Sequence, residues 1–171
     1  MKPPFAVKVC APDILHKTEK KGVILNVELS DLDRALDTIR LKFPGKNILV
    51  EEQVKFTGPE FIIGAIKDPD YGVAVMAGAG GIMTEIYQDA GFRLAPCPIK
   101  EAERMLDDLS IAPILHGYRG IRLDRHELAK TISVVGDVAL CLGKKFSQFD
   151  INPIVFSNKK WVVLDAKIIL D

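Results

Sequence analysis

The chain has few cysteines and no cysteine pattern. Its three cysteines stand at positions 10, 97 and 141, with no C-x-x-C pair. This spacing excludes the disulfide framework of a small secreted domain and the ligand spacing of a structural zinc site. We therefore expect free thiols in the core, where unpaired cysteines are commonly buried.

An excess of one charge and long apolar runs are also missing. Lysine plus arginine and aspartate plus glutamate number 23 each, so the formal net charge is +0. No overall field would draw the chain to nucleic acid or to an anionic membrane, and any anion site must be local. No stretch approaches the roughly 18 apolar residues of a membrane span, and the first residues are too short a run for a signal peptide. These features predict a cytoplasmic protein that binds neither nucleic acid nor membranes.

Apolar residues are plentiful enough for a sizeable core. They make up 48% of 171 residues, which suits one domain or two small lobes. Apolar runs punctuated by glycine and proline predict an α+β class with short links and mainly antiparallel pairing. The expected strands are 5–11, 22–28, 47–54, 61–66, 72–77, 82–87, 92–95, 146–156 and 161–170, and the expected helices are 30–41, 99–109 and 124–142.

The last predicted hairpin carries polar residues that need a partner. Asp150 and Asn152 alternate with apolar residues on one strand, so they share a face. Asp165 lies in the apolar strand after the turn, where an unpaired charge is costly. Oxygen ligands that converge from two paired strands suit Mg²⁺, which takes one or two carboxylates with phosphate and water oxygens. An Asx turn at Asp150 and Asn152, with a salt bridge from Asp165, is the alternative, and spacing alone does not separate the two.

Three segments of the sequence resemble a known family. FDINPIV at 149–155 and VVLDAKI at 162–168 are similar to the closing hairpin of succinyl-CoA synthetase β chains and ADP-forming acetyl-CoA synthetases. VKVCAPDILHKTEKKGV at 7–23 is similar to the family segment V-L-K-x-x-S-P-D-I-x-H-K. The resemblance covers most of the chain and implies an ATP-grasp fold, in which two α+β lobes hold the nucleotide between them. We expect a first lobe at 1–48 and a second lobe at 49–171. The first lobe would be only a remainder, because relatives have a further helix and strand before the segment that contains Lys8.

The resemblance also implies roles for the hairpin and for a histidine. Asn152 and Asp165 would hold the Mg²⁺ of bound ATP or ADP, and Asp150 would lie near a phosphohistidine as its polar partner. His16 would relay phosphate between the phosphohistidine of an α chain and ADP, since an imidazole nitrogen can carry a phosphoryl group covalently. Taken without the resemblance, His16 is also consistent with a solvent-facing loop histidine.

Two lysines are expected to contact phosphate. Lys8 lies inside an apolar strand, where a lysine is rarely unpaired, and in ATP-grasp enzymes the matching lysine is a point charge on the nucleotide phosphates. Snorkelling of Lys8 to the surface is the alternative. Lys17, beside His16, would neutralise the transferred phosphate, and Lys21 stands where relatives often have a glycine.

The segment that joins the lobes would bind the base and ribose. The resemblance implies that backbone groups of residues 51–54 recognise adenine; these are Glu51, Glu52, Gln53 and Val54. Glu60 matches a glutamate that faces the ribose in the family, and an ordinary exposed carboxylate at a strand start explains it as well.

Glycines and an arginine complete the candidates. Gly80 and Gly81 belong to a G-x-G-G segment whose amides would form an anion-binding nest, and a glycine-rich turn is the alternative. Arg119, in a G-x-R-G segment, is expected near the phosphates, or in a salt bridge with a neighbouring acid.

The family implies a reversible reaction in which acyl-CoA, ADP and phosphate give acid, CoA and ATP. This chain would supply the ATP-binding end of an acid–CoA ligase, inactive without a CoA-binding α subunit or domain. Apolar surface left by an incomplete lobe also predicts an oligomer or partner. Two other hypotheses stay open, namely a non-catalytic nucleotide-binding or assembly module that keeps the ATP-grasp fold, and the β portion of a fused protein acetyltransferase.

Overall fold

The computed structural model describes residues 1–11, 14, 17, 20–81 and 89–171. These residues form two compact units, Met1–Lys55 and Phe56–Asp171, and each is described by itself. The strand expected at 82–87 and the candidate His16 lie outside the described residues.

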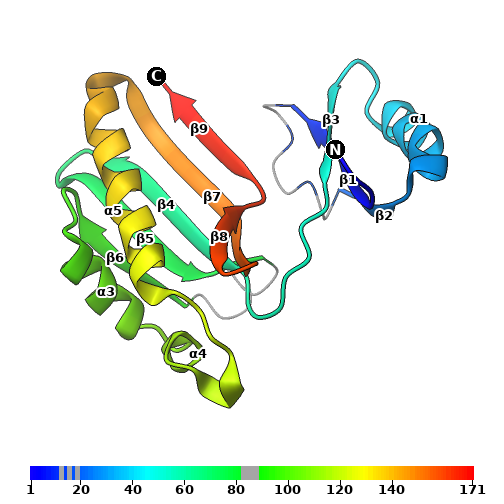
Figure 1. Ribbon diagram of the computed structural model, residues 1–171. Helices are drawn as coiled ribbons and strands as arrows, with labels where there is room; N and C mark the ends of the chain where they lie inside the picture. The colour runs from blue at the N-terminus through cyan, green and yellow to red at the C-terminus, as the bar shows by residue number, and fades with distance from the viewer. Residues whose placement is uncertain (12–13, 15–16, 18–19, 82–88) are drawn as a thin grey trace. The chain divides into compact units, whose positions relative to one another are not determined.

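The first unit is an antiparallel sheet in the order β2-β1-β3 with one helix packed on it. Its elements are β1 (Phe5–Cys10), β2 (Val23–Val27), α1 (Leu32–Lys42) and β3 (Asn47–Glu52), drawn in blue to cyan in Figure 1. Alternate residues of β1 (Phe5, Val7 and Val9) share a core with Ala35 and Ile39 of α1, as expected for a strand with one face toward a helix. The expected helix 30–41 begins later than predicted, because a 3-10 turn at Leu29–Asp31 precedes it.

The boundary between the units follows strand pairing. β3 pairs with β1 from Phe5 opposite Glu52 to Cys10 opposite Asn47, so all of β3 belongs to the first unit. The boundary expected from the sequence, after residue 48, would fall within β3. Residues 49–55 therefore continue the first unit, and the second unit begins at Phe56.

The second unit is a larger antiparallel sheet with helices on one face. The described strands follow the order β6-β5-β4-β7-β8, and β9 also pairs with β7. The strands are β4 (Phe61–Asp68), β5 (Gly72–Ala79), β6 (Ala90–Leu94), β7 (Phe146–Ser157), β8 (Lys160–Val163) and β9 (Ala166–Leu170). The helices are α3 (Ile99–Asp107), the short α4 (Ala112–Leu115) and α5 (Arg125–Leu142), with 3-10 turns at Tyr118–Gly120 and Gly143–Lys145. Figure 1 shows α3 and α5 against the sheet.

The core of the second unit explains its two long helices. Phe61, Ile63 and Val75 of the sheet pack against Met105 of α3 and Ile132 of α5. The predicted cap of α5 is present, since the Asp124 carboxylate accepts a hydrogen bond from the backbone N–H of Glu127 at 3.0 Å. The α+β class is confirmed. Within the described part of the chain, no helix combines the length and apolar character needed to cross a membrane.

Candidate functional site

The two candidate metal ligands lie beside an irregularity of the second sheet. Ile151 of β7 is opposite Ile63 of β4, and Ile154 is opposite Phe61, so β7 has one more residue than β4 between these pairs. This bulge turns the strand, and Ile151 and Ile154 both reach the core, with 5% and 1% exposure. A simple alternation does not place both isoleucines on one face, and the bulge at residues 152–153 does.

The partner strand is interrupted at the same level. The expected single strand 161–170 is instead β8 and β9, separated at Leu164 and Asp165. The N–H of Asn152 donates to the carbonyl of Asp165 at 3.1 Å, and the N–H of Leu164 donates to the carbonyl of Pro153 at 2.9 Å. The backbones of Asn152 and Asp165 are therefore direct neighbours across the hairpin.

The glycine segment and Glu60 meet the hairpin at this end of the sheet. The N–H of Gly81 donates to Asn152 Oδ1 at 3.0 Å, and the N–H of Gly80 donates to the carbonyl of Glu60 at 2.8 Å. Gly81 has φ +60°, and a Cβ on it would lie 1.6 Å from Glu60 Oε2. The Glu60 carboxyl therefore rests against Gly81, where burial raises its pKa. Glu60, Gly80, Gly81, Asn152 and Asp165 form one group, called here the hairpin site.

The donors of the hairpin site fit Mg²⁺ that arrives with phosphate. An amide oxygen and carboxylates are the hard ligands that Mg²⁺ prefers, and it needs few from the protein when phosphate and water supply the rest. Among the described residues, no group of three or more His, Cys, Asp or Glu side chains is placed to hold a metal. Asp150, the other candidate on β7, is opposite Gly64 of β4 and Lys167 of β9.

The first unit holds Lys8 and the expected adenine segment. Lys8 is buried, with 8% exposure, and its ammonium group is hydrogen-bonded to the Glu51 carboxylate. Glu52 accepts a hydrogen bond from the N–H of Lys2 at 2.6 Å, and the N–H of Gln53 donates to the carbonyl of Pro4 at 2.9 Å. The snorkelling alternative for Lys8 does not fit its burial. Val54 is half-buried.

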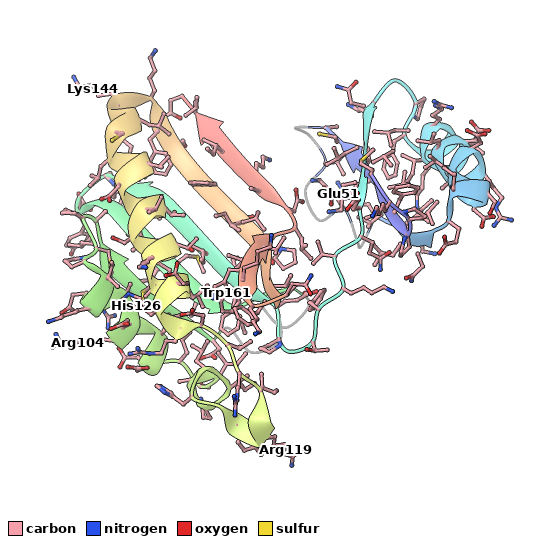
Figure 2. The ribbon with its side chains drawn as sticks, viewed as in Figure 1. Glu51, Arg104, Arg119, His126, Lys144 and Trp161 are labelled. Atoms are coloured by element: carbon pink, nitrogen blue, oxygen red, sulfur yellow. The ribbon has the colours of Figure 1, made fainter. Side chains whose placement is uncertain are left out.

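Two other candidates lie in loops. The carbonyl of Lys17 accepts a hydrogen bond from the N–H of Gly22 at 2.7 Å, which closes its loop onto the start of β2. Arg119 is exposed at the tip of the loop between α4 and α5 (Figure 2). It has φ +53°, and its guanidinium carbon Cζ lies 5.3 Å from the centre of the Tyr118 ring. The same loop lies close to the segment before Glu60. A Cβ atom added to Gly58 would be 3.8 Å from Cγ2 of Ile121.

Asp89 is a residue to which the sequence assigned no role. Its carboxylate accepts hydrogen bonds from the N–H groups of Ser110 at 2.8 Å and Ile111 at 2.9 Å, and its carbonyl accepts one from Ala79 at 3.0 Å. The hydrogen bonds of Asp89 thus connect the segment before α4 to the end of β5, next to Gly80. A lone aspartate after a glycine-rich stretch carries no sequence signal for this.

A cluster of ionisable groups supports the helices rather than the hairpin site. Arg125 binds Asp107 through two nitrogens at 2.8 and 2.7 Å, and His116 contacts the same carboxylate at 2.9 Å. The Arg125 hydrogen bond holds the pKa of Asp107 below its usual value. His126 contacts Glu103 at 2.8 Å. Both described histidines therefore have acidic partners on α3.

Comparison with known protein families identifies the fold. The chain matches the ATP-grasp domain over residues 1–170. It belongs to the ATP-grasp family, which confirms the fold expected from the sequence.

Individual relatives narrow the class. The chain is 35% identical over 175 residues to the β subunit of the ADP-forming acetate–CoA ligase I of Pyrococcus furiosus, and the match covers 98% of this chain and 75% of that one. It is 31% identical over 180 residues to the ADP-forming acetate–CoA ligase I of Archaeoglobus fulgidus, again over 98% of this chain but only 25% of the longer relative. Within the ATP-grasp family, this chain belongs with the β subunits of ADP-forming acetate–CoA ligases.

Solved structures agree with this placement. A crystal structure of a Pyrococcus horikoshii protein matches with a TM-score of 0.88 and 32% identity, over 99% of this chain and 75% of that one. An acetyl-coenzyme A synthetase of Candidatus Korarchaeum cryptofilum matches with a TM-score of 0.85 and 29% identity, over 99% of this chain and 78% of that one. That structure holds coenzyme A and Mg-AMPPCP, with its phosphohistidine segment pointing towards the nucleotide binding site.

Proposed function

We propose that this chain is the ATP-binding β component of an ADP-forming acyl-CoA synthetase and that it transfers phosphate between a phosphohistidine and ADP. The observation that carries the proposal is the pairing of Asn152 with Asp165 at the bulge of β7, joined by a 3.1 Å backbone hydrogen bond. Membership of the acetate–CoA ligase β subunits supports it. CoA binding and acyl-phosphate chemistry are assigned to an α partner.

Three residues of the hairpin site, together with Lys8, would contribute to holding the nucleotide. Asn152 and Asp165 would hold Mg²⁺, which when bound neutralises charge on the phosphate oxygens. The N–H of Gly81 donates to Asn152 Oδ1 at 3.0 Å and so fixes the orientation of that amide. Lys8, in the first unit, would place a positive charge on a phosphate. Phosphoryl transfer requires mainly positioning and charge neutralisation, and this set of residues supplies both.

His16 is proposed to carry the phosphoryl group. One imidazole nitrogen bonds to the γ-phosphorus of ATP while the bond from that phosphorus to ADP breaks, and ADP leaves with the electron pair. The reverse step makes ATP from ADP and phosphohistidine. Lys17 would neutralise the added charge, and Asp150 would accept a hydrogen bond from the ring N–H of a phosphohistidine. The α partner would exchange phosphate with His16 by the same chemistry.

Labelling with γ-³²P-ATP tests the transfer. The chain has three histidines, at 16, 116 and 126, so His116→Asn and His126→Asn are matched controls for His16→Asn. With Mg-ATP we expect acid-labile, base-stable label on the wild type and both controls, and none on His16→Asn. Label that survives in His16→Asn would refute the relay. Nucleotide binding without any label, also after an α partner is added, would favour the non-catalytic nucleotide-binding module.

A further inference from the structure

Lys8 is buried in the first unit, and its position on β1 determines which face of the sheet its side chain occupies. β1 is the central strand, between β2 and β3. Val7 and Val9, on either side of Lys8, belong to the core that α1 covers. Because side chains alternate along a strand, Lys8 belongs to the opposite face of the sheet.

Glu51 shares that face. Antiparallel pairing puts Glu51 opposite Ala6 and Lys8 opposite Leu49, so Lys8 and Glu51 are diagonal neighbours on one face. The Lys8 ammonium donates a hydrogen bond to Glu51 Oε1, and the side-chain exposures are 11% for Lys8 and 35% for Glu51. Figure 2 shows Glu51 on β3 within this sheet. Glu52, next along β3, belongs to the other face and has 56% side-chain exposure.

The Lys8–Glu51 contact reduces two free-energy costs of placing a lysine in a buried position. Removing an ammonium group from water is unfavourable unless an opposite charge is close. A lysine side chain also loses much rotamer freedom when it is fixed. The Glu51 carboxylate offsets the first cost and restricts the orientation of the ammonium group before any ligand arrives. An ammonium group has three N–H donors, so contact with a carboxylate is compatible with contact with a phosphate oxygen at the same time.

We propose that Glu51 is a positioning residue, whose carboxylate orients Lys8 toward the nucleotide phosphates. This goes beyond the expectation that residues 51–54 act through their backbone, and it rests on the proposed function. Glu51 need not touch the nucleotide. In the complex with nucleotide the phosphate supplies the opposite charge, so the hydrogen-bond acceptor of Glu51 is then the required feature and its negative charge opposes the phosphate. The two properties separate in substitutions that keep or remove the acceptor.

Calorimetric titration of the full chain with Mg-ADP tests the proposal. Glu51→Ala removes the acceptor, and we expect ADP affinity to fall about tenfold, the change that 1.4 kcal/mol produces. Glu51→Gln keeps an acceptor oxygen and removes the opposing charge, so most of the affinity returns. Glu28→Ala, at an exposed glutamate of the same unit, is the matched control. Affinity for adenosine, measured by competition against ADP, is expected to stay the same in all four proteins.

A double-mutant cycle separates positioning from a general structural effect. In a Lys8→Met background, Glu51→Ala should cause no further loss of ADP affinity, because there is no ammonium group to orient. An equal loss with and without Lys8, or a parallel loss for adenosine, would overturn the proposal. So would ADP affinity in Glu51→Ala that matches Glu28→Ala. Failure of the wild type to bind Mg-ADP would instead refute the proposed function, before any variant is compared.

Discussion

Three glycine substitutions in the second unit make a graded test of how closely the hairpin site is packed. Gly117 has φ +92°, and a Cβ there would meet only the Ile121 carbonyl, at 3.8 Å. Gly81 has φ +60°, and its Cβ would fall on the Glu60 carboxyl, the movable end of a flexible side chain. Gly80 has the least room for adjustment, because its Cβ would lie 2.4 Å and 2.5 Å from the backbone carbon and oxygen of Phe61, which are not free to move as a side chain is.

The expected losses in the free energy of unfolding follow from these contacts. Gly117→Ala adds only the strain of a left-handed alanine, about 1–2 kcal/mol. Gly81→Ala adds the same strain and displaces Glu60, for a total of about 2–3 kcal/mol. Gly80→Ala forces β5 away from β4 and breaks the 2.8 Å hydrogen bond from Gly80 to Glu60. It should cost about 3 kcal/mol or more.

Urea unfolding followed by tryptophan fluorescence measures the series. The chain has one tryptophan, Trp161, whose ring packs edge-on against Phe61 at 5.4 Å, so its signal reports the second unit. With a slope of about 2 kcal/mol per molar urea, the midpoint should fall by about 0.5–1 M for Gly117→Ala and about 1.5 M or more for Gly80→Ala. A midpoint for Gly80→Ala no lower than that of Gly117→Ala would refute the contact argument.

Three further substitutions give predictions of different sign. Asp89→Ala removes the acceptor of two backbone N–H groups, at 2.8 and 2.9 Å, and should cost about 1–3 kcal/mol in urea unfolding, with Asp89→Asn closer to wild type. Burial raises the pKa of Glu60, so its favourable contribution to stability exists below the unfolded pKa and is lost as pH rises through the folded pKa. Glu60→Gln should therefore raise the melting temperature at pH 7, and a gain that does not shrink toward pH 4 would contradict this. The hydrogen bond from Arg125 lowers the pKa of Asp107, so its contribution exists above the unfolded pKa and is lost as pH falls through the folded pKa. Asp107→Asn should lower the melting temperature at pH 7 by more than in acid, and a uniform change across pH would count against the ion pair.

Much of the fold could be predicted from the sequence, because local pattern and punctuation agree with the packing. Helix 124–142 was bounded by an aspartate cap and a following glycine, and the structure has α5 at Arg125–Leu142 with Asp124 as cap. The strand expected at 61–66 continues to Asp68 as β4, because polar residues at its end still pair with β5. Periodicity does not report where such pairing stops.

The bulge in β7 shows what simple alternation misses. Asn152 and Asp165 were expected on paired strands, and the structure brings them together, although their role in metal binding stays a prediction. The break between β8 and β9 was not expected. Pro153 was the available signal, since proline has no N–H for the sheet and is confined largely to edges and bulges.

Long-range partners were beyond the sequence. Nothing local indicates that Asp89 contacts Ser110, or that Glu51 contacts Lys8, which are 43 positions apart. Such pairs are set by strand register and helix placement, which depend on the whole fold. The expected backbone role of residues 51–54 likewise gave no information on the Glu51 side chain.

A thermal shift with Mg-ADP tests whether Asn152 and Asp165 form a Mg-nucleotide site. The test pair is the Asn152→Ala, Asp165→Ala variant and a control of the same composition, Asn47→Ala, Asp137→Ala, at exposed residues. At about 100 times the dissociation constant, binding stabilises the folded chain by about 2.7 kcal/mol, which raises the melting temperature by roughly 5–10 °C. We predict this shift for wild type and control with Mg²⁺, and its loss with EDTA or in the hairpin variant. An equal shift in the hairpin variant and the control, or one that EDTA leaves unchanged, would contradict the account.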